Sequence, residues 1–344
     1  MGNEQRRFGL GVVGAGMGAK PHALALNALR DRVDVRGVWR RNRNELARFC
    51  AEYGLPAAPS YDALLADPSI DAILVLTPPN AREDIVAAAV AAGKHVLMEK
   101  PVERTTAAAE RIVARCAGAG VKLGIIFQHR FRAASRALAE KVGSGEMGRL
   151  QAVHLVVPWW RPQEGYYDKP GRGTFAQDGG GVLITQAIHS LDLMLSLTGP
   201  ASAVTALSAT TGLHSMETED FVAGGIEFAN GAVGALMATT ANFPGGAESL
   251  TLNFDRASAT LTGGNLTISW MDGRTQTIGE ASNSGGGADP MAFPFDWHQA
   301  QIEDFIDAVR MDRQPLSTGQ SALDVHRLID ALVRSGREGK RVEV

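Results

Sequence analysis

Short, continuously apolar runs alternate with amphipathic segments along the first third of the chain. The apolar runs predict strands at Phe8–Val13, Val33–Trp39, Ala72–Leu76, His95–Met98 and Lys122–Phe127. The segments between them predict helices at Ala23–Leu29, Asn44–Tyr53, Tyr61–Ala66 and Arg82–Ala92, and a further helix that ends at about Ala117. Apolar strands that alternate with helices are typical of a parallel sheet covered on both faces. We therefore expect a doubly wound α/β Rossmann domain over residues 1–128.

The pattern changes after about Gln128, and residues 129–344 predict an α+β domain with a large, mostly antiparallel open sheet. Helices are expected at Ala133–Val142 and roughly Val182–Leu197, with a strand at Leu150–Val157 between them. Between Ala203 and Trp270, strands are predicted at Phe221–Phe228, Ala232–Thr240, Ser249–Asp255, Ser258–Thr262 and Leu266–Trp270. The pair Asn230-Gly231 between two apolar runs is a strong hairpin signal. Two closing helices, Trp297–Met311 and Ser317–Ser335, leave open whether the chain end packs back on the first domain.

Two of the predicted strands, Phe221–Phe228 and Ala232–Thr240, carry apolar residues on both of their alternating sides. A single layer of helices rarely covers a broad antiparallel sheet completely. We therefore expect the second domain to bind substrate and also to join copies of the chain, through its sheet, into a homodimer or homotetramer.

Composition excludes several classes of partner. The chain has 344 residues and a formal net charge of -3, which gives no general attraction for nucleic acid or anionic membranes. No run of 18 uncharged apolar residues predicts a membrane span, and Arg6-Arg7 before the first strand makes only a weak export signal. The two cysteines, Cys50 and Cys116, are typical of a reducing compartment, although a disulfide between them stays an alternative. We expect a cytoplasmic protein, and the dispersed histidines predict no metal site.

A glycine turn between the first strand and the first helix carries the most informative chemistry. The residues Gly14, Gly16, Met17, Gly18 and Ala19 form a G-x-G-x-x-A pattern. Small residues there let the backbone turn tightly and approach a pyrophosphate, which the free N–H groups of the following helix bind. The position directly after a strand makes a dinucleotide site the preferred interpretation over a merely tight turn.

The end of the second predicted strand distinguishes between the two nicotinamide cofactors. Arg40 and Arg41 stand where an Asp or Glu would bind the adenosine ribose of NAD. A guanidinium there binds a 2′-phosphate through charge-assisted hydrogen bonds, whereas a carboxylate repels it. We expect a preference for NADP, with NAD as the other possible cofactor. The alternative is a pair of solvated surface arginines.

Three motifs, in order, resemble the Gfo/Idh/MocA oxidoreductases, the family of glucose–fructose oxidoreductase and inositol dehydrogenase. They are Gly14–Ala19, then Glu99-Lys100-Pro101 after the fourth predicted strand, and then the segment Gly179–Asp192. The segments Gln301–Phe305 and Ser335–Val342 also resemble the closing helices of the family. The resemblance extends over nearly the whole chain. It implies transfer of a hydride between a nicotinamide cofactor and a secondary alcohol or ketone of a sugar, polyol or related cyclic compound.

The resemblance also implies catalytic roles for Lys100, His189 and Thr185. Lys100 of the E-K-P segment would contact the reacting hydroxyl and favour the alkoxide-like charge of hydride transfer. His189 would accept the proton of the alcohol, or donate it to the ketone. Many family members carry Asp where this chain has Thr185, whose hydroxyl can orient an oxygen or a water. Asp192 would either hold the imidazole tautomer or face the helix surface.

Other candidates lie after the predicted strands and in a loop rich in Trp, Tyr, Arg and Gly. Aromatic faces stack on pyranose rings, and Arg, Gln and Asp bind hydroxyls, while paired arginines can also hold a carboxylate or phosphate. The cofactor-binding candidates are Gly14, Gly16, Met17, Gly18, Ala19, Arg40, Arg41, Thr77, Pro78, Asn80, Glu99 and Lys100. The substrate-binding candidates are Lys100, Gln128, Arg130, Trp159, Arg161, Tyr167, Arg172, Asp178, Thr185 and His189. One of Trp159 and Trp160 is expected in the core, because neighbours on an extended chain point to opposite sides.

The leading hypothesis is therefore an NAD(P)-dependent dehydrogenase or reductase that acts on CH–OH groups of a sugar-like substrate. Two other functions fit the same motifs. One is a nucleotide-sensing regulatory protein that has lost catalysis, against which the presence of Lys100 and His189 argues. The other is a glycosidase of the same fold that uses NAD for transient oxidation.

Overall fold

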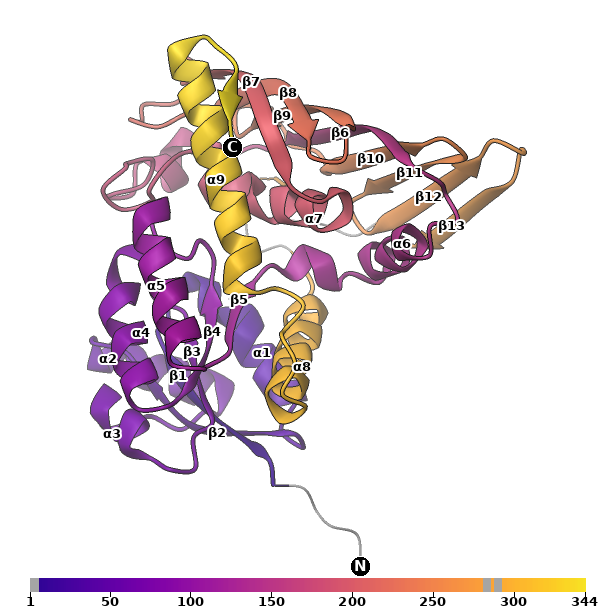
Figure 1. Cartoon of the computed structure of the whole chain (residues 1–344). Helices are drawn as coiled ribbons and strands as arrows, with labels where there is room; N and C mark the ends of the chain where they lie inside the picture. The colour runs from indigo at the N-terminus through magenta and orange to yellow at the C-terminus, as the bar shows by residue number, and fades with distance from the viewer. Residues whose placement is uncertain (1–5, 281–285, 288–292) are drawn as a thin grey trace, which may run out of the picture. The chain divides into compact units, whose positions relative to one another are not determined.

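A parallel sheet forms the centre of the first of two compact units. The computed structural model describes residues 6–280, 286–287 and 293–344 (Figure 1). Five described strands pair in the order β2-β1-β3-β4-β5, and all their pairings are parallel. Their bounds are β1 Phe8–Val13, β2 Val33–Trp39, β3 Ala72–Val75, β4 His95–Glu99 and β5 Leu123–Ile126. The predicted doubly wound α/β sheet is confirmed, and each strand lies within about two residues of its predicted position.

The helices of this first unit pack on the sheet through apolar side chains. They are α1 Lys20–Ala28, α2 Arg43–Tyr53, α3 Tyr61–Ala66, α4 Arg82–Ala91, α5 Thr106–Gly118 and α8 Asp296–Arg310. Although α8 comes late in the chain, its Ile302, Phe305 and Ile306 belong to the same buried core as the strands β1, β3 and β4. These residues recur every three or four positions, so they form one apolar stripe on α8. The first unit thus contains Pro294–Gln320 as well as the N-terminal part of the chain.

A wide sheet forms the second unit, which contains Phe127–Phe293 and Ser321–Val344. Its described strands run in the order β13-β12-β11-β10-β6-β9-β8-β7-β14, and β6 with β9 is the parallel pair in an otherwise antiparallel arrangement. The bounds are β6 Leu150–Pro158, β7 Ala201–Ala209, β8 Phe221–Phe228, β9 Val233–Thr239, β10 Ser249–Phe254, β11 Ala257–Thr262, β12 Asn265–Trp270, β13 Thr275–Gly279 and β14 Val342–Glu343. Gly231, with φ at 87°, turns the β8–β9 hairpin that Asn230-Gly231 predicts. The mostly antiparallel open sheet is therefore confirmed.

Helices cover one face of this second sheet. The helix α6 (Ala133–Gly143) contacts β11, β12 and β13, while α7 (Ile188–Thr198) contacts β6. The long α9 (Gly319–Glu338) carries the chain toward β14 (Figure 1). A π-helical turn, η5 (Leu183–Ala187), precedes α7 where the sequence predicts one regular helix, and such turns recur at functional sites. Among the described residues, no helix has the length and apolar character to cross a membrane.

Candidate active site

The glycine turn after β1 is shaped for a ligand that approaches the backbone. Gly14 has φ at 107°, and a Cβ there would lie 2.7 Å from the carbonyl carbon of Leu76, so only glycine fits. At Gly16 and Gly18, by contrast, a Cβ would meet no atom within 4 Å. Packing within the protein therefore does not require these two glycines, whereas close approach of a pyrophosphate would. Ala19 ends this turn and is buried, directly before α1.

Arg40, at the end of β2, lies against this turn. Its Nη1 donates to the carbonyl of Ala15 at 2.6 Å, and its guanidinium also pairs with Glu45 in the first turn of α2. Its neighbour Arg41 is exposed. The structure thus brings Arg40 beside the predicted pyrophosphate site, although Arg40 and Ala15 stand 25 positions apart in the sequence.

The segment after β3 contributes the next group of candidates. Thr77 is half-buried, while Pro78 and Asn80 are exposed at the start of the 3-10 turn η2 (Pro79–Ala81). Among the described residues, the Thr77 Oγ1 atom is buried and has no hydrogen-bond partner. An orphaned hydroxyl at the carboxyl end of a parallel strand fits a bound nucleotide, because that edge is where doubly wound sheets bind their ligands.

The main chain around Lys100 is held by a buried arginine that the sequence analysis did not single out. Arg82, at the start of α4, is 2% exposed. It donates to the carbonyl of Thr77 at 2.9 and 2.8 Å and to the carbonyls of Glu99 and Pro101 on either side of Lys100. Burial lowers the pKa of Arg82 to about 10, while Glu99 opposes the shift, so the side chain stays charged at neutral pH. The Lys100–Pro101 peptide is cis.

Glu99 supports the same turn from its other side. Its Oε2 accepts from the backbone N–H of Lys100 at 3.0 Å, and its Oε1 lies 2.8 Å from Nε2 of His22 on α1. Burial alone would raise the pKa of Glu99, but the hydrogen bond and charge of His22, together with Lys100, lower it to about 2. An ionised carboxylate therefore accepts from the backbone N–H of Lys100, the residue that we expect to meet the substrate oxygen.

A third side chain completes this cluster. The His298 ring on α8 packs edge-on against His22 with ring centroids 4.7 Å apart, and the ligand atoms of His22, Glu99 and His298 lie within 4.8 Å of one another. Such a set has the chemistry of a metal site. The direct 2.8 Å contact between His22 and Glu99 is a hydrogen bond, so we interpret the cluster as a proton-linked support for the Lys100 turn. Sequence spacing does not reveal it, because its members are far apart along the chain.

We expect His298 to make folding sensitive to acid. Burial and then the nearby His22 lower the pKa of His298 to about 3, below its ordinary 6.5. Between these values the unfolded chain binds a proton that the folded chain does not, so the free energy of unfolding falls as the pH drops through this window. Between pH 7 and pH 5, the free energy of unfolding of the wild type should fall by about 2 kcal/mol more than that of His298→Gln. Denaturant titrations at the two pH values measure this difference. Equal pH dependence in wild type and variant would contradict this, and exposed His154→Gln is the matched control.

In the second unit, η5 and α7 carry the other predicted catalytic residues. His189 is 6% exposed, and its ring lies 5.1 Å from that of His129 and edge-on to Phe127. The Thr185 hydroxyl donates to the carbonyl of Gly181 at 2.7 Å, four residues earlier. The Thr185 hydroxyl hydrogen is thus engaged with the main chain just before η5, and the role of Thr185 toward a substrate stays a prediction.

A buried carboxylate fixes the start of this helical segment. Glu219 accepts from the backbone N–H groups of Gly181 and Leu183 at 3.1 and 3.3 Å. These are N–H groups that a helix leaves unsatisfied at its beginning. Burial raises the pKa of Glu219, although the backbone hydrogen bonds oppose the shift. No motif in the sequence analysis pointed to this residue.

Asp192 does not face the helix surface, which was one of the two roles left open by the sequence. It is fully buried, and its carboxylate makes a two-pronged contact with Arg130 at 2.5 and 2.6 Å. Burial raises the pKa of Asp192, and the Arg130 charge acts in the opposite direction. Gln128, in the same 3-10 turn as Arg130, is 6% exposed, and its Oε1 has no partner among the described residues. The amide oxygen of Gln128 is thus a candidate contact for a ligand hydroxyl.

The predicted substrate loop after β6 places most of its candidates inside the protein. Trp159 is 3% exposed and is the core member of the Trp pair, whereas Trp160 is half-buried.

Burial raises the pKa of Tyr167, whose hydroxyl lies 2.8 Å from that of Thr240. Arg172 pairs with Asp178 at 3.2 Å and also stacks on the Tyr166 ring. Arg161 is 1% exposed and donates to Gln186, Gly287 and Trp160. Their roles toward a substrate stay predictions.

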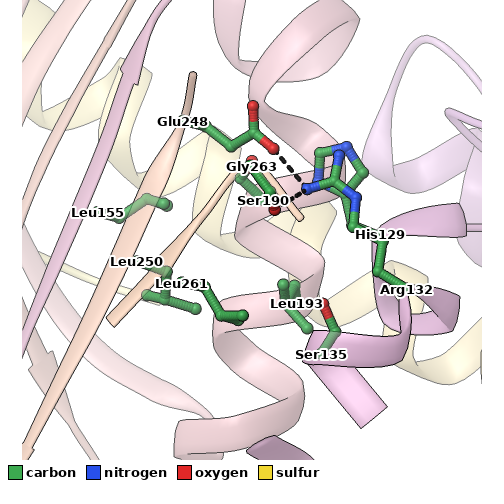
Figure 2. A pocket seen from close by; sticks show the side chains of 10 residues that line it. All are labelled: His129, Arg132, Ser135, Leu155, Ser190, Leu193, Glu248, Leu250, Leu261 and Gly263. Atoms are coloured by element: carbon green, nitrogen blue, oxygen red, sulfur yellow. Dashed lines mark hydrogen bonds and ion pairs between the residues drawn. The ribbon is translucent and has the colours of Figure 1, made fainter. Parts of the chain in front are cut away.

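A small cavity lies elsewhere in this unit, under α6 and α7. Figure 2 shows the buried pair Arg132–Glu248, at 2.5 Å, beside Ser190 and His129. The hydroxyls of Ser135 and Ser190 have no partner among the described residues. The cavity volume of about 10 Å³ accommodates one water molecule and excludes a sugar. This cavity is therefore not the substrate site.

Comparisons with known proteins agree with this geometry. Residues 8–127 match the model of an oxidoreductase family with an NAD-binding Rossmann fold, and residues 135–260 match the GFO/IDH/MocA C-terminal domain. The chain is 27% identical over 307 residues to a 1,5-anhydro-D-fructose reductase of Ensifer adhaerens, covering 87% of each chain. It is 26% identical to D-xylose 1-dehydrogenase (NADP(+)) 2 of Haloferax volcanii, covering 97% of this chain and 99% of that one.

A solved structure extends the similarity to three dimensions. The WlbA dehydrogenase from Bordetella pertussis, in complex with NADH and UDP-GlcNAcA, superposes with a TM-score of 0.82. It is 27% identical, and the match covers 98% of this chain and 99% of that one. The match thus includes residues of both units.

Proposed function

The chain belongs to the Gfo/Idh/MocA oxidoreductases, and on this premise we propose that it transfers a hydride between NADP(H) and a secondary alcohol or ketone of a sugar-like ring. The general reaction, nicotinamide-dependent oxidation or reduction, is that of the family. One observation carries the choice of substrate class. Relatives that match over nearly their whole length are named as a reductase of an anhydro-sugar and a dehydrogenase of xylose.

Lys100 and His189 have different roles in the proposed reaction. The bound nicotinamide supplies the hydride acceptor or donor. Lys100 stabilises the negative charge that develops on the substrate oxygen. His189 takes the hydroxyl proton during oxidation and returns it during reduction, so the C–H and O–H bonds of the alcohol become the C=O bond of the ketone. Arg82, Glu99 and His22 hold the main chain that carries Lys100.

Assay of a panel of sugars and polyols with NADP+ and NAD+ tests this function. We expect turnover of at least one cyclic substrate, with NADP(H) released in each cycle, which separates a dehydrogenase from an NAD-dependent glycosidase. The reverse assay uses ketoses or anhydro-ketoses with NADPH. His189→Ala is the matched control for contaminating activity. Cofactor binding without turnover of any member in either direction would favour a regulatory protein instead.

We also propose that the second sheet joins copies of the chain. The outer face of this sheet carries an apolar row, in which Leu207, Ala223, Met237 and Val156 stand beside one another on β7, β8, β9 and β6. Leu207 is 61% exposed in the single chain. Burial of such a row is favourable at about 25 cal/mol per Å².

Met237→Lys should therefore dissociate the oligomer, because it places a charge in the middle of this row. Light scattering at working concentrations measures the outcome. Gln276→Lys, on the exposed β13 strand, is the control that should leave the assembly unchanged. A wild-type protein that is monomeric throughout would rule the sheet interface out.

A further inference from the structure

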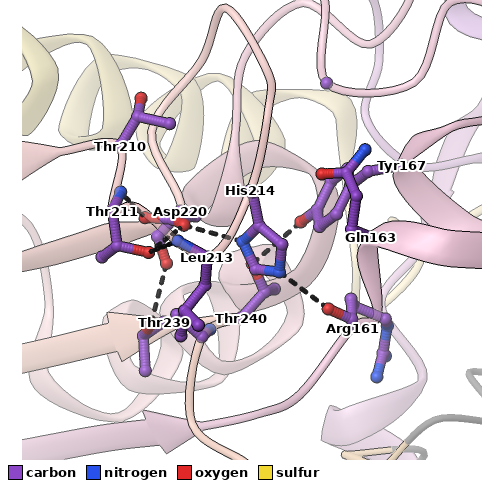
Figure 3. Close-up of polar contacts among 12 residues, drawn as sticks. Arg161, Gln163, Tyr167, Thr210, Thr211, Leu213, His214, Asp220, Thr239 and Thr240 are labelled. Carbon is purple, nitrogen blue, oxygen red and sulfur yellow. Dashed lines mark hydrogen bonds and ion pairs between the residues drawn. The ribbon is translucent and has the colours of Figure 1, made fainter.

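A buried histidine and aspartate lie in the second unit, outside every motif that the sequence analysis identified. His214 belongs to the segment between β7 and β8, and Asp220 directly precedes β8. The side chains of both residues have no exposed surface, and His214 Nδ1 lies 2.7 Å from Asp220 Oδ2 (Figure 3). Two ionisable groups fully removed from water persist in proteins when they are paired and have further hydrogen bonds.

The contacts of this pair define where its protons are. His214 Nε2 lies 2.8 Å from the carbonyl oxygen of Arg161, which can only accept, so Nε2 carries a hydrogen. Asp220 already accepts from the backbone N–H of Thr211 at 2.8 Å and from the Thr211 hydroxyl at 2.7 Å. A carboxyl group that receives these donors is the ionised acceptor, so His214 Nδ1 also donates. The imidazole therefore carries hydrogens on both nitrogens and forms an ion pair with Asp220.

The other polar groups around His214 are engaged elsewhere and do not compensate the charge of its imidazolium. The Tyr167 ring lies 4.7 Å from the imidazole, and its hydroxyl is engaged with Thr240. Glu219, next to Asp220 in the chain, binds Gly181 and Leu183. The Arg161 guanidinium donates to Gln186 and Gly287, away from the pair. Asp220 is thus the partner that compensates the imidazolium.

Arg161, whose carbonyl His214 holds, connects the loop after β6 with the helical segment that carries Thr185 and His189. The Arg161 N–H donates to the carbonyl of Thr240 at 2.9 Å, and Nη2 donates to Gln186 Oε1 at 2.9 Å. Gln186, next to Thr185 in η5, donates in turn to the Tyr166 hydroxyl at 2.6 Å. Any shift of the Arg161 backbone therefore moves the loop relative to this helical segment.

We propose that the His214–Asp220 ion pair is a positioning device that fixes the sugar-binding loop through the Arg161 carbonyl. The proposal rests on the proposed function only in treating this loop as the substrate loop. His214 and Asp220 touch neither cofactor nor substrate. They hold the loop so that its partly exposed members, Trp160 and Arg172, are in position to contact the substrate.

Two isosteric variants separate the two contacts of His214. In His214→Asn the amide nitrogen takes the place of Nδ1, so the contact with Asp220 is kept and that with Arg161 is lost. In His214→Gln the amide takes the place of Nε2, so the contact with Arg161 is kept. We expect His214→Asn to raise the KM for sugar about 10- to 100-fold, the range of a charge-assisted hydrogen bond. Its kcat and its cofactor affinity should change by less than a few fold. His214→Gln, which keeps the contact with Arg161 but loses the ion pair, should raise the KM less than His214→Asn does.

Two measurements test the placement without any substrate. Limited trypsin digestion should cut after Arg172, which precedes Gly173, faster in His214→Asn than in His214→Gln or wild type. Nitrogen-15 NMR of the full chain should show two ring N–H groups for His214, with signals that disappear in His214→Asn. If the sugar panel shows no turnover, the proposed function fails, while these two experiments still decide the role of His214. A neutral, singly protonated ring, or equal digestion and KM in the two variants, would overturn the proposal.

Discussion

His189→Ala should lower kcat by about 10²–10⁴, the usual contribution of a positioned acid–base group. The side chain is 6% exposed and packs against His129 and Phe127, so its ring is held in one orientation. Lys100→Ala should be comparably severe, because it removes the charge that faces the developing alkoxide. The turn that carries Lys100 stays fixed in this variant, since Arg82 and Glu99 bind its main chain.

Thr185→Ala should be the mildest of the three changes. The Thr185 hydroxyl donates to the Gly181 carbonyl, and loss of one neutral hydrogen bond costs roughly 0.5–1.5 kcal/mol. Steady-state kinetics on the three variants, with cofactor affinity measured separately, decides between these roles. Ser196→Ala, on the exposed side of α7, is the control that should leave kcat unchanged. Near-normal turnover in His189→Ala, or the largest defect in Thr185→Ala, would mean that the proton takes another path.

Arg40→Asp should reverse the cofactor preference from NADP to NAD. The Arg40 guanidinium lies beside the glycine turn, where it contacts Ala15 and pairs with Glu45. A 2′-phosphate on the ribose would compete with Glu45 for this guanidinium, and each charge-assisted hydrogen bond lost in the variant is worth roughly 1.5–3 kcal/mol. We therefore expect NADP(H) affinity to fall at least tenfold, while NAD(H) affinity rises or stays constant.

Glu45→Gln should change the NADP(H) affinity in the opposite direction to Arg40→Asp. It removes the carboxylate that competes for Arg40, so NADP(H) should bind more tightly than in wild type. Fluorescence titrations with NADPH and NADH measure both variants. Equal affinity of the wild type for the two cofactors, or an Arg40→Asp variant that keeps its NADPH affinity, would show that Arg40 is a surface residue without a role in cofactor choice.

The course of the chain could largely be predicted because secondary structure follows local patterns. The continuous apolar runs predict each described strand of the first sheet, and Asn230-Gly231 predicts the β8–β9 hairpin. The strand Thr275–Gly279 was missed, since its residues are exposed and polar and carry no periodic signal. The π-helical turn before α7 was also missed, because its apolar residues follow the pattern of an ordinary buried helix.

The sequence by itself determined the fold class and the glycine turn after β1. It also placed Lys100 directly after a predicted strand and His189 within a predicted helix. Each of these depends on residues that are neighbours in the chain. Only the tertiary structure decided which distant side chains meet. It placed His298 beside His22, paired Asp192 with Arg130, and set His214 between Asp220 and the Arg161 carbonyl. The reason is physical: a buried charge takes whichever partner packing brings within hydrogen-bond distance, and packing is set by the whole fold.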